Sequence, residues 1–270
     1  MPRQSRPSPY NPSTVGPDDV SQWGFAAGTV GVPRFLCVVA VGVCMPMKAT
    51  GTATGFTEID RFEDGVGWIA HPDEEMRRAS HALRVPAGEG DDEDGVLVVD
   101  PVDADGVDDL FAEFGDVRGV VVLMDRHGRD AAAIAERHDV PIYVPSFVDP
   151  GIDARTQPVT DRLPGTDFEV LRTVDIPGWD EAALYDGETL VVGDAVGTAK
   201  YFTTGEERVG VHPMLRVKPP RALEGLQPER VLVGHGEGVL HDGAGALAYA
   251  LDGARRRAPK AWLGALRSMV

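Results

Sequence analysis

The order of apolar segments along this chain predicts an α/β fold, a four-layer sandwich with two β-sheets inside and helices outside. Two observations predict it. The chain has two halves, and each half gives strands first and then strand–helix units. Several strand segments are apolar throughout, which is typical of strands buried on both faces.

The first half contains apolar strand segments and two helical patterns between them. The expected elements, in order, are strands at 66–70, 81–85 and 96–99, a helix at 105–114, a strand at 119–123, an alanine-rich helix at 129–138 and a strand at 142–144.

The second half repeats this order. We expect strands at 168–173, 183–185 and 189–192, a short helix at 222–226, a buried strand at 230–233 and a terminal helix at 243–257. Asp186 and Gly187 separate two of these strands, and this dipeptide favours a tight hairpin turn.

Residues 1–50 differ from the rest of the chain. They carry a net charge of +2, against −19 for residues 51–270, and Pro, Ser, Gly and Asn crowd their first 33 positions. Such a composition buries too little apolar area to order a chain. We expect residues 1–50 to be a disordered or mis-assigned extension, with Met45 or Met47 as the true start, and residues 51–270 to form a single domain.

The apolar run at 35–44 has ten residues, about half of what a bilayer span needs. We therefore expect no stable membrane span and a cytoplasmic protein, although a signal or anchor segment stays open as a second interpretation. The two cysteines, Cys37 and Cys44, both lie in this region. The body of the protein can hold neither a disulfide framework nor a thiolate zinc site.

Acidic residues dominate the 270-residue chain, with 43 Asp and Glu against 26 Lys and Arg, a net charge of −17 and a pI near 4.7. Such a field repels phosphates, which argues against nucleic acid as a partner. Asp is abundant and only four lysines occur, a balance that suits hydration in concentrated salt. An acidic interaction surface is the alternative. No phosphate-binding glycine loop or serine nucleophile elbow follows a strand.

Polar residues follow four of the predicted strands. They are Asp100, the segment 124–130, Asp194 and His235. Strand ends of α/β folds meet at one rim, where chemistry usually lies. Carboxylate oxygen and imidazole nitrogen together suit zinc, iron or manganese.

The order of these segments resembles the metallo-β-lactamase fold family over most of residues 51–270. Asp100 stands at that family's strand-end Asp, and strand 120–123 leads into the loop that usually reads His-x-His-x-Asp-His. Segment 176–179 resembles the Pro-Gly-His element, segment 190–194 the strand ending in the bridging Asp, and segment 233–236 the final His.

The metal-binding motif departs from this pattern. With Asp130 at the motif's Asp, the three histidine positions hold Arg126, Gly128 and Ala131, and Trp179 replaces the histidine of the Pro-Gly-His element. The resemblance then implies that one of the family's two metal positions is lost.

A reduced site would remain. By the resemblance, Asp130, Asp194 and His235 would bind one divalent ion, zinc, iron or manganese, with Asp130 as a ligand or as the base for an attacking water. The protein would be a hydrolase of a small ester, thioester or phosphoester. Its oligomeric state stays open.

A second alignment of the motif puts Asp125 and His127 at the first two histidine positions and Asp130 at the last. It requires Arg129 in place of an acid, so we prefer the first alignment. An Asp125 and His127 ligand pair stays open if the loop is rearranged.

The same residues can also form a rim without metal. Arg126 or Arg129 would pair with Asp130 or Asp194, and Trp179 would fill the vacated space. In that case the protein would be a catalytically inactive member of the fold that binds a small-molecule ligand or another protein.

Overall fold

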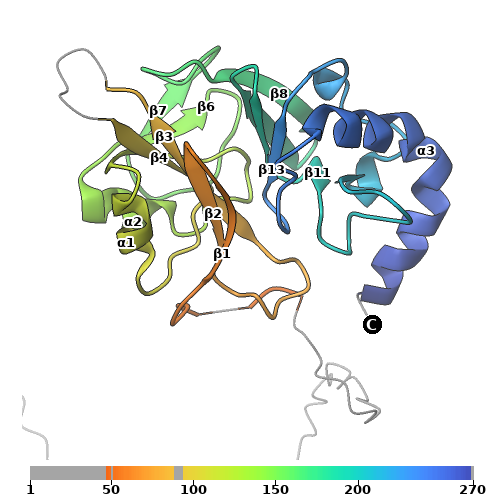
Figure 1. Cartoon of the computed structure of the whole chain (residues 1–270), viewed down its shortest axis with the longest axis horizontal. Helices are drawn as coiled ribbons and strands as arrows, with labels where there is room; N and C mark the ends of the chain where they lie inside the picture. Colours follow the sequence, from red (N-terminus) through yellow and green to blue (C-terminus); the bar gives the residue numbers. More distant parts are fainter. Residues whose placement is uncertain (1–46, 50, 88–93, 269–270) are drawn as a thin grey trace, which may run out of the picture. The chain divides into compact units, whose positions relative to one another are not determined.

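Apolar segments of the first half pair into a seven-stranded sheet in the order β1 to β7 (Figure 1). The computed structural model describes residues 47–49, 51–87 and 94–268. The strands are β1 Thr57–Phe62, β2 Gly65–Ile69, β3 Ala79–Val85, β4 Gly95–Val99, β5 Asp116–Val121, β6 Ile142–Pro145 and β7 Thr156–Val159. Pairing is antiparallel from β1 to β4 and parallel from β4 to β7. The expected extension at 1–50 lies outside the described residues apart from residues 47–49.

The second half forms a four-stranded sheet in the order β13, β10, β9, β8. These strands are β8 Glu169–Ile176, β9 Trp179–Tyr185, β10 Thr189–Val192 and β13 Arg230–Val233. A small ladder joins β11 Val196–Gly197 to β12 Gly210–Val211, and the 3₁₀ turns are η1 Pro213–Leu215 and η2 Arg221–Leu223. The expected turn between β9 and β10 is confirmed, because the two strands pair antiparallel across Asp186 and Gly187.

Residues of β4 alternate between the two faces of the first sheet. Val96 packs in one apolar cluster with Leu110 of helix α1 (Val107–Ala112) and with helix α2 (Ala131–His138). Its neighbour Leu97 packs in another cluster with Val191 of the second sheet. Because successive side chains of a strand point to opposite faces, one strand contacts both the helix layer and the facing sheet.

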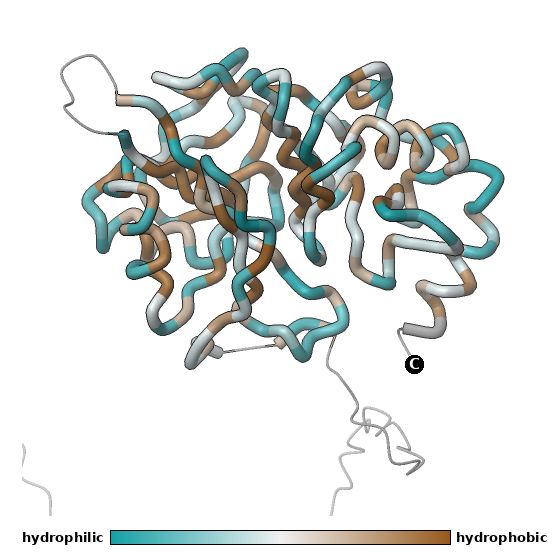
Figure 2. The backbone as a smooth tube through the Cα atoms, viewed as in Figure 1, coloured by the Kyte–Doolittle hydropathy of each residue, from teal (hydrophilic) through white to brown (hydrophobic). Residues whose placement is uncertain are grey.

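Helix α3 (Gly243–Ser268) covers the outer face of the second sheet. Leu247 and Ala250 pack with Val192 and Val233 in a third apolar cluster. In Figure 2 the hydrophobic segments gather in the strands at the centre of the molecule. The four-layer α/β sandwich is therefore confirmed.

Two elements differ from expectation. The predicted helix at 222–226 is only the 3₁₀ turn η2, and Gly225, two residues after its end, adopts a φ of 80° that no helix continues through. Helix α3 continues past Pro259 to Ser268 instead of ending at 257. Its buried alanines explain this extension, since residues 254, 258, 261 and 265 form one stripe against the protein.

Strands β1 and β7 were not expected, and they are the two edges of the first sheet. β7 exposes three of its four residues and contains Pro158. Proline is tolerated at an edge, because the N–H it lacks would face solvent. Among the described residues, no helix has the length and apolar content needed to cross a bilayer.

Candidate metal centre

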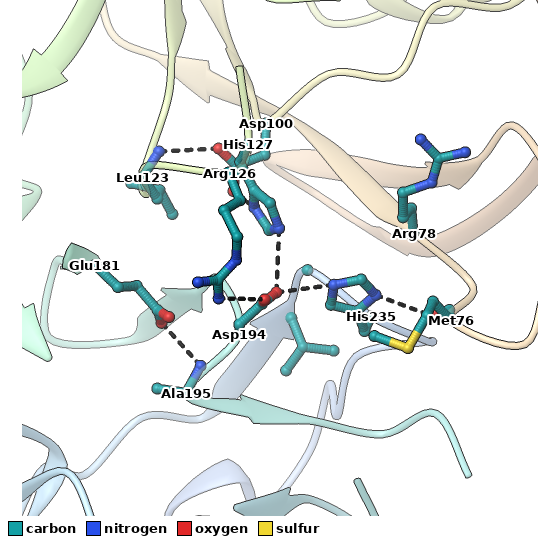
Figure 3. Close-up of polar contacts among 12 residues, drawn as sticks. Met76, Arg78, Asp100, Leu123, Arg126, His127, Glu181, Asp194, Ala195 and His235 are labelled. Atoms are coloured by element: carbon teal, nitrogen blue, oxygen red, sulfur yellow. Dashed lines mark hydrogen bonds and ion pairs between the residues drawn. The ribbon is translucent and has the colours of Figure 1, made fainter. Parts of the chain in front are cut away.

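Three side chains from two sheets meet at one rim (Figure 3). His127 lies in the loop after β5, Asp194 follows β10 and His235 follows β13. Val192 and Val233 are paired in the parallel ladder, so residues two positions beyond each lie at the same edge. One ligand atom from each of the three residues lies within 4.8 Å of the other two.

The three ligand atoms lie close to one another. Asp194 Oδ1 lies 2.8 Å from His235 Nε2 and 3.1 Å from His127 Nε2. Asp194 Oδ1 and His235 Nε2 are buried and have no hydrogen-bond partner among the described residues. Buried polar atoms without partners are costly, and a cation between such atoms would satisfy them.

Both histidines are oriented by their other ring nitrogen. His127 Nδ1 lies 2.7 Å from Asp100 Oδ2, and His235 Nδ1 lies 2.8 Å from the carbonyl oxygen of Met76. A carboxylate or carbonyl oxygen accepts, so each Nδ1 carries a proton, and in the neutral ring Nε2 keeps its lone pair. Ligand histidines of metal sites show this arrangement.

Asp100 holds its position through its own backbone and side chain. It has a φ of 47°, and its Oδ1 accepts a hydrogen bond of 2.9 Å from the Leu123 backbone N–H. Ser80 Oγ donates to its carbonyl oxygen at 2.9 Å. Asp100, expected at a strand end, is thus a support for His127.

Two guanidinium groups border the three ligand atoms. Arg129 is buried and donates to His127 Nε2 at 3.1 Å and to the Gly234 carbonyl at 3.3 Å. It also donates to the carbonyls of Ala79 and Asp100, at 2.7 and 2.8 Å. Burial lowers the pKa of Arg129, which reflects the cost of a charge in this position.

Arg126 is the second cation, and it is partly exposed. Its Nη2 lies 3.3 Å from Asp194 Oδ2, and its guanidinium lies 4.8 Å from the centre of the Trp179 ring. Burial alone would raise the pKa of Asp194, but His235 and His127 in their protonated form hold it well below its usual range. Asp194 is therefore the anionic centre of the rim.

Asp130, the expected third ligand and base, lies elsewhere. It is the N-cap residue directly before α2, and its Oδ2 accepts a hydrogen bond of 2.9 Å from the Asp103 backbone N–H. The group of three contains His127 in its place, the histidine of the second alignment. The reason is local: Arg129 adopts a φ of 37°, and the Ala131 N–H bonds back to Gly128, so the chain turns into α2 before Asp130 can reach the rim.

A buried glutamate beside the rim was missed by the sequence reasoning. Glu181 Oε2 accepts a 2.9 Å hydrogen bond from Trp179 Nε1, and its Oε1 accepts one of 2.9 Å from the Ala195 backbone N–H. Burial, together with the negative charge of Asp194, raises the pKa of Glu181 to about 7. The available signal was weak: β9 carries two adjacent acids, Asp180 and Glu181, before its apolar run.

The donor set fits one divalent ion. Two imidazole nitrogens and one carboxylate oxygen match the ligands of open zinc, iron or manganese sites. Among the described residues, no other group of three potential ligands was found. The residues therefore offer one ion position, with Arg126 and Arg129 on its border.

No protein-family model and no curated protein sequence matches this chain. Solved structures do match it in shape. A single-substitution mutant of a flavo di-iron protein from Thermotoga maritima has 15% sequence identity and a TM-score of 0.53, with 74% of this chain and 63% of that chain covered.

Two metallo-β-lactamases match over nearly their whole length. TMB-1 has 13% identity and a TM-score of 0.48, covering 77% of this chain and 99% of that chain. FIM-1 from Pseudomonas aeruginosa, in a mono-zinc form, has 10% identity and a TM-score of 0.48, covering 75% and 97%. The four layers, the two sheets and the strand-end residues give this chain the metallo-β-lactamase fold.

Proposed function

We propose that this protein is a hydrolase with a single divalent metal ion bound by His127, Asp194 and His235. The observation that carries the proposal is the approach of Asp194 Oδ1 to His235 Nε2 at 2.8 Å, with both atoms buried and without hydrogen bonds. Fixed Nδ1 protons on both histidines support it, because they leave Nε2 free to bind.

A divalent ion in such a site supplies Lewis-acid polarisation of a substrate oxygen and lowers the pKa of a bound water. The protein's own groups set the conditions for this chemistry. Asp100 and the Met76 carbonyl hold the ring orientations, and Asp194 carries the negative charge that draws a cation to the rim.

Arg126 favours a substrate with a negative or developing negative charge. Its side chain is 44% exposed, and it borders Asp194 Oδ2. A guanidinium at the mouth of a site can bind a carboxylate, a phosphate or the oxyanion of an acyl-transfer reaction. A small ester, thioester or phosphoester therefore remains the proposed substrate class, by analogy with the fold.

A second candidate is a metal-free, catalytically inactive protein that binds a small ligand. One contact favours it: Arg129 donates to His127 Nε2 at 3.1 Å and so occupies the lone pair that a metal would need. The same guanidinium would repel a dication.

Metal analysis of the full chain separates the two candidates. The purified protein would be incubated with zinc, iron or manganese in turn, desalted and analysed by plasma mass spectrometry. The hydrolase proposal expects about one ion per chain, in line with a three-ligand open site, and ester, thioester or phosphoester hydrolysis that chelation removes. If none of the three metals is retained in stoichiometric amount, the metal-free alternative holds.

A further inference from the structure

Large apolar side chains are exposed along the C-terminal half of α3 and the neighbouring η1 segment. Five of the seven exposed large apolar residues among the described residues lie there: Met214, Val217, Trp262, Leu263 and Leu266, with exposed fractions of 69, 56, 44, 51 and 62%. Two hydrogen bonds join the segments. Trp262 Nε1 donates to the Pro213 carbonyl at 2.8 Å, and Arg255 Nε donates to the Val217 carbonyl at 2.9 Å.

The same region is basic, whereas the chain as a whole carries a charge of −17. Asp252 is the last acid of the sequence, and no acid occurs between Glu207 and Glu224. The exposed basic residues of the two segments are Lys218, Arg255, Arg256 and Lys260. Together with the five apolar residues they form what we call the basic–apolar face.

Helical spacing separates three sides of α3. Its alanine stripe faces the protein, as described above. Trp262 and Leu266, four residues apart, project beside each other, and Arg256 and Lys260, also four apart, form the next row. In Figure 1 these last turns run along the right-hand edge of the molecule to the C-terminus. The exposed part of the helix is therefore itself amphipathic, because it has an apolar row beside a basic row.

We propose that the basic–apolar face binds the surface of an anionic membrane. Interfacial helices combine Trp and Leu on one side with Lys and Arg on the other, so that the apolar row enters the acyl boundary and the cations meet lipid phosphates. The binding is peripheral, since no described helix can cross a bilayer.

Charge decides between this partner and a second copy of the chain. A symmetric dimer brings the same face of both copies together, so four exposed cations per copy would meet their like. An anionic lipid surface offers phosphates to the cations and an acyl boundary to the apolar row, so one partner binds both. An acidic protein partner would satisfy the cations, but the five protruding apolar side chains would also need a matching groove.

Vesicle co-sedimentation of the full chain tests the proposal. One set of vesicles contains one part phosphatidylglycerol to two parts phosphatidylcholine, and the other contains phosphatidylcholine alone. We expect binding to the anionic vesicles to exceed binding to the neutral ones at least about ten-fold. Added salt should reduce that excess, because it screens the charges.

Two exposed substitutions locate the binding. Leu266→Glu and Lys260→Glu should each lower binding to the anionic vesicles about ten-fold or more, the first by placing a charge in the apolar row. Arg155→Glu is the control matched to Lys260→Glu, since it makes the same charge change at an exposed residue just before β7. It should bind like the wild type, and circular dichroism should show all three variants folded.

Three results would overturn the proposal. They are equal binding of the wild type to both kinds of vesicle, no binding to either, and unchanged binding of Leu266→Glu. Light scattering of the same proteins addresses the other partner. A wild-type oligomer that Leu266→Glu dissociates would assign the face to contact between copies. Metal content plays no part in these readouts, so this proposal and the proposed hydrolase can fail separately.

Discussion

His235 Nε2 lies 2.8 Å from Asp194 Oδ1, and neither atom has a hydrogen-bond partner among the described residues. The two residues stand at equivalent positions after neighbouring parallel strands, so the ladder between β10 and β13 sets their approach. The two buried atoms therefore face each other across the ends of these strands. This arrangement costs stability in the absence of a cation, and functional sites commonly carry such costs.

Removal of either histidine should abolish metal binding. We expect His127→Ala and His235→Ala to lose stoichiometric metal, because two protein ligands rarely hold a divalent ion in a catalytic site. Asp130→Ala is the control and should keep the ion, since its carboxylate bonds to Asp103 and lies outside the group. Plasma mass spectrometry of the desalted proteins measures this. Loss of metal from Asp130→Ala would show that Asp130 is a metal ligand after all.

Asp100→Asn should weaken metal binding without touching a ligand. The Asn amide can donate to His127 Nδ1, which would move the ring proton to Nε2 and remove the ligand lone pair. A loss of about 10–100-fold in affinity is typical of such a change. Competition with a chromophoric chelator measures the affinity. An unchanged affinity would show that Asp100 does not orient His127.

Substitution of Arg129 should have opposite effects on stability and on metal affinity. Arg129→Met removes donors from the carbonyls of Ala79, Asp100 and Gly234, so the free energy of unfolding should fall by about 1–3 kcal/mol. Metal affinity should rise, because a cation beside the site is gone and His127 Nε2 is released. Urea unfolding and the chelator titration measure the two effects. Lower stability with no metal binding would favour the metal-free alternative.

His81 should make the protein less stable in acid. It is buried in β3 with its Nε2 3.1 Å from the Val233 carbonyl, and burial lowers its pKa to about 4 against the opposing charge of Asp100. In the unfolded chain the pKa is about 6.5. As pH falls from 6.5 to 4, His81 binds a proton in the unfolded state but stays neutral in the folded state. The free energy of unfolding therefore falls by about 3 kcal/mol.

Urea unfolding across this pH range tests the effect of His81. His81→Gln should flatten the dependence, because its side chain does not titrate. His241→Gln replaces a side chain that is 89% exposed and should leave the slope as in the wild type. Equal slopes for wild type and His81→Gln would show that other groups cause the acid sensitivity.

A buried ion cluster should be essential for stability. Glu207 is fully buried and accepts from Arg216 Nη2 at 2.7 Å and from Arg257 Nε of α3 at 2.6 Å. Glu207→Gln leaves two guanidinium groups without their counter-charge, which should cost about 3–5 kcal/mol. Glu206→Gln changes the exposed neighbour and serves as control. A thermal midpoint as high as that of the control would contradict this account.

Apolar runs and their spacing were enough to predict the layers. The run at 96–99 and the repeats of the second half indicated buried strands, and the structure places them in two facing sheets. The edge strands β1 and β7 gave no comparable signal, because their exposed faces carry few apolar residues. The alanine stripe that extends α3 past Pro259 stabilises it only through contact with the protein.

The sequence by itself determined which strands end in polar residues, and so brought Asp100, Asp194 and His235 to one rim. Asp194 and His235 each lie two residues beyond a pair of aligned strand residues, and the apolar pattern of the sequence is enough to predict where those strands end. Only the tertiary structure decided which residue of the loop at 124–130 joins them. The structure follows the second alignment of the motif, which is shifted by one residue from the preferred one. With a φ of 37° at Arg129, His127 lies beside Asp194, and Asp130 becomes the N-cap residue of α2.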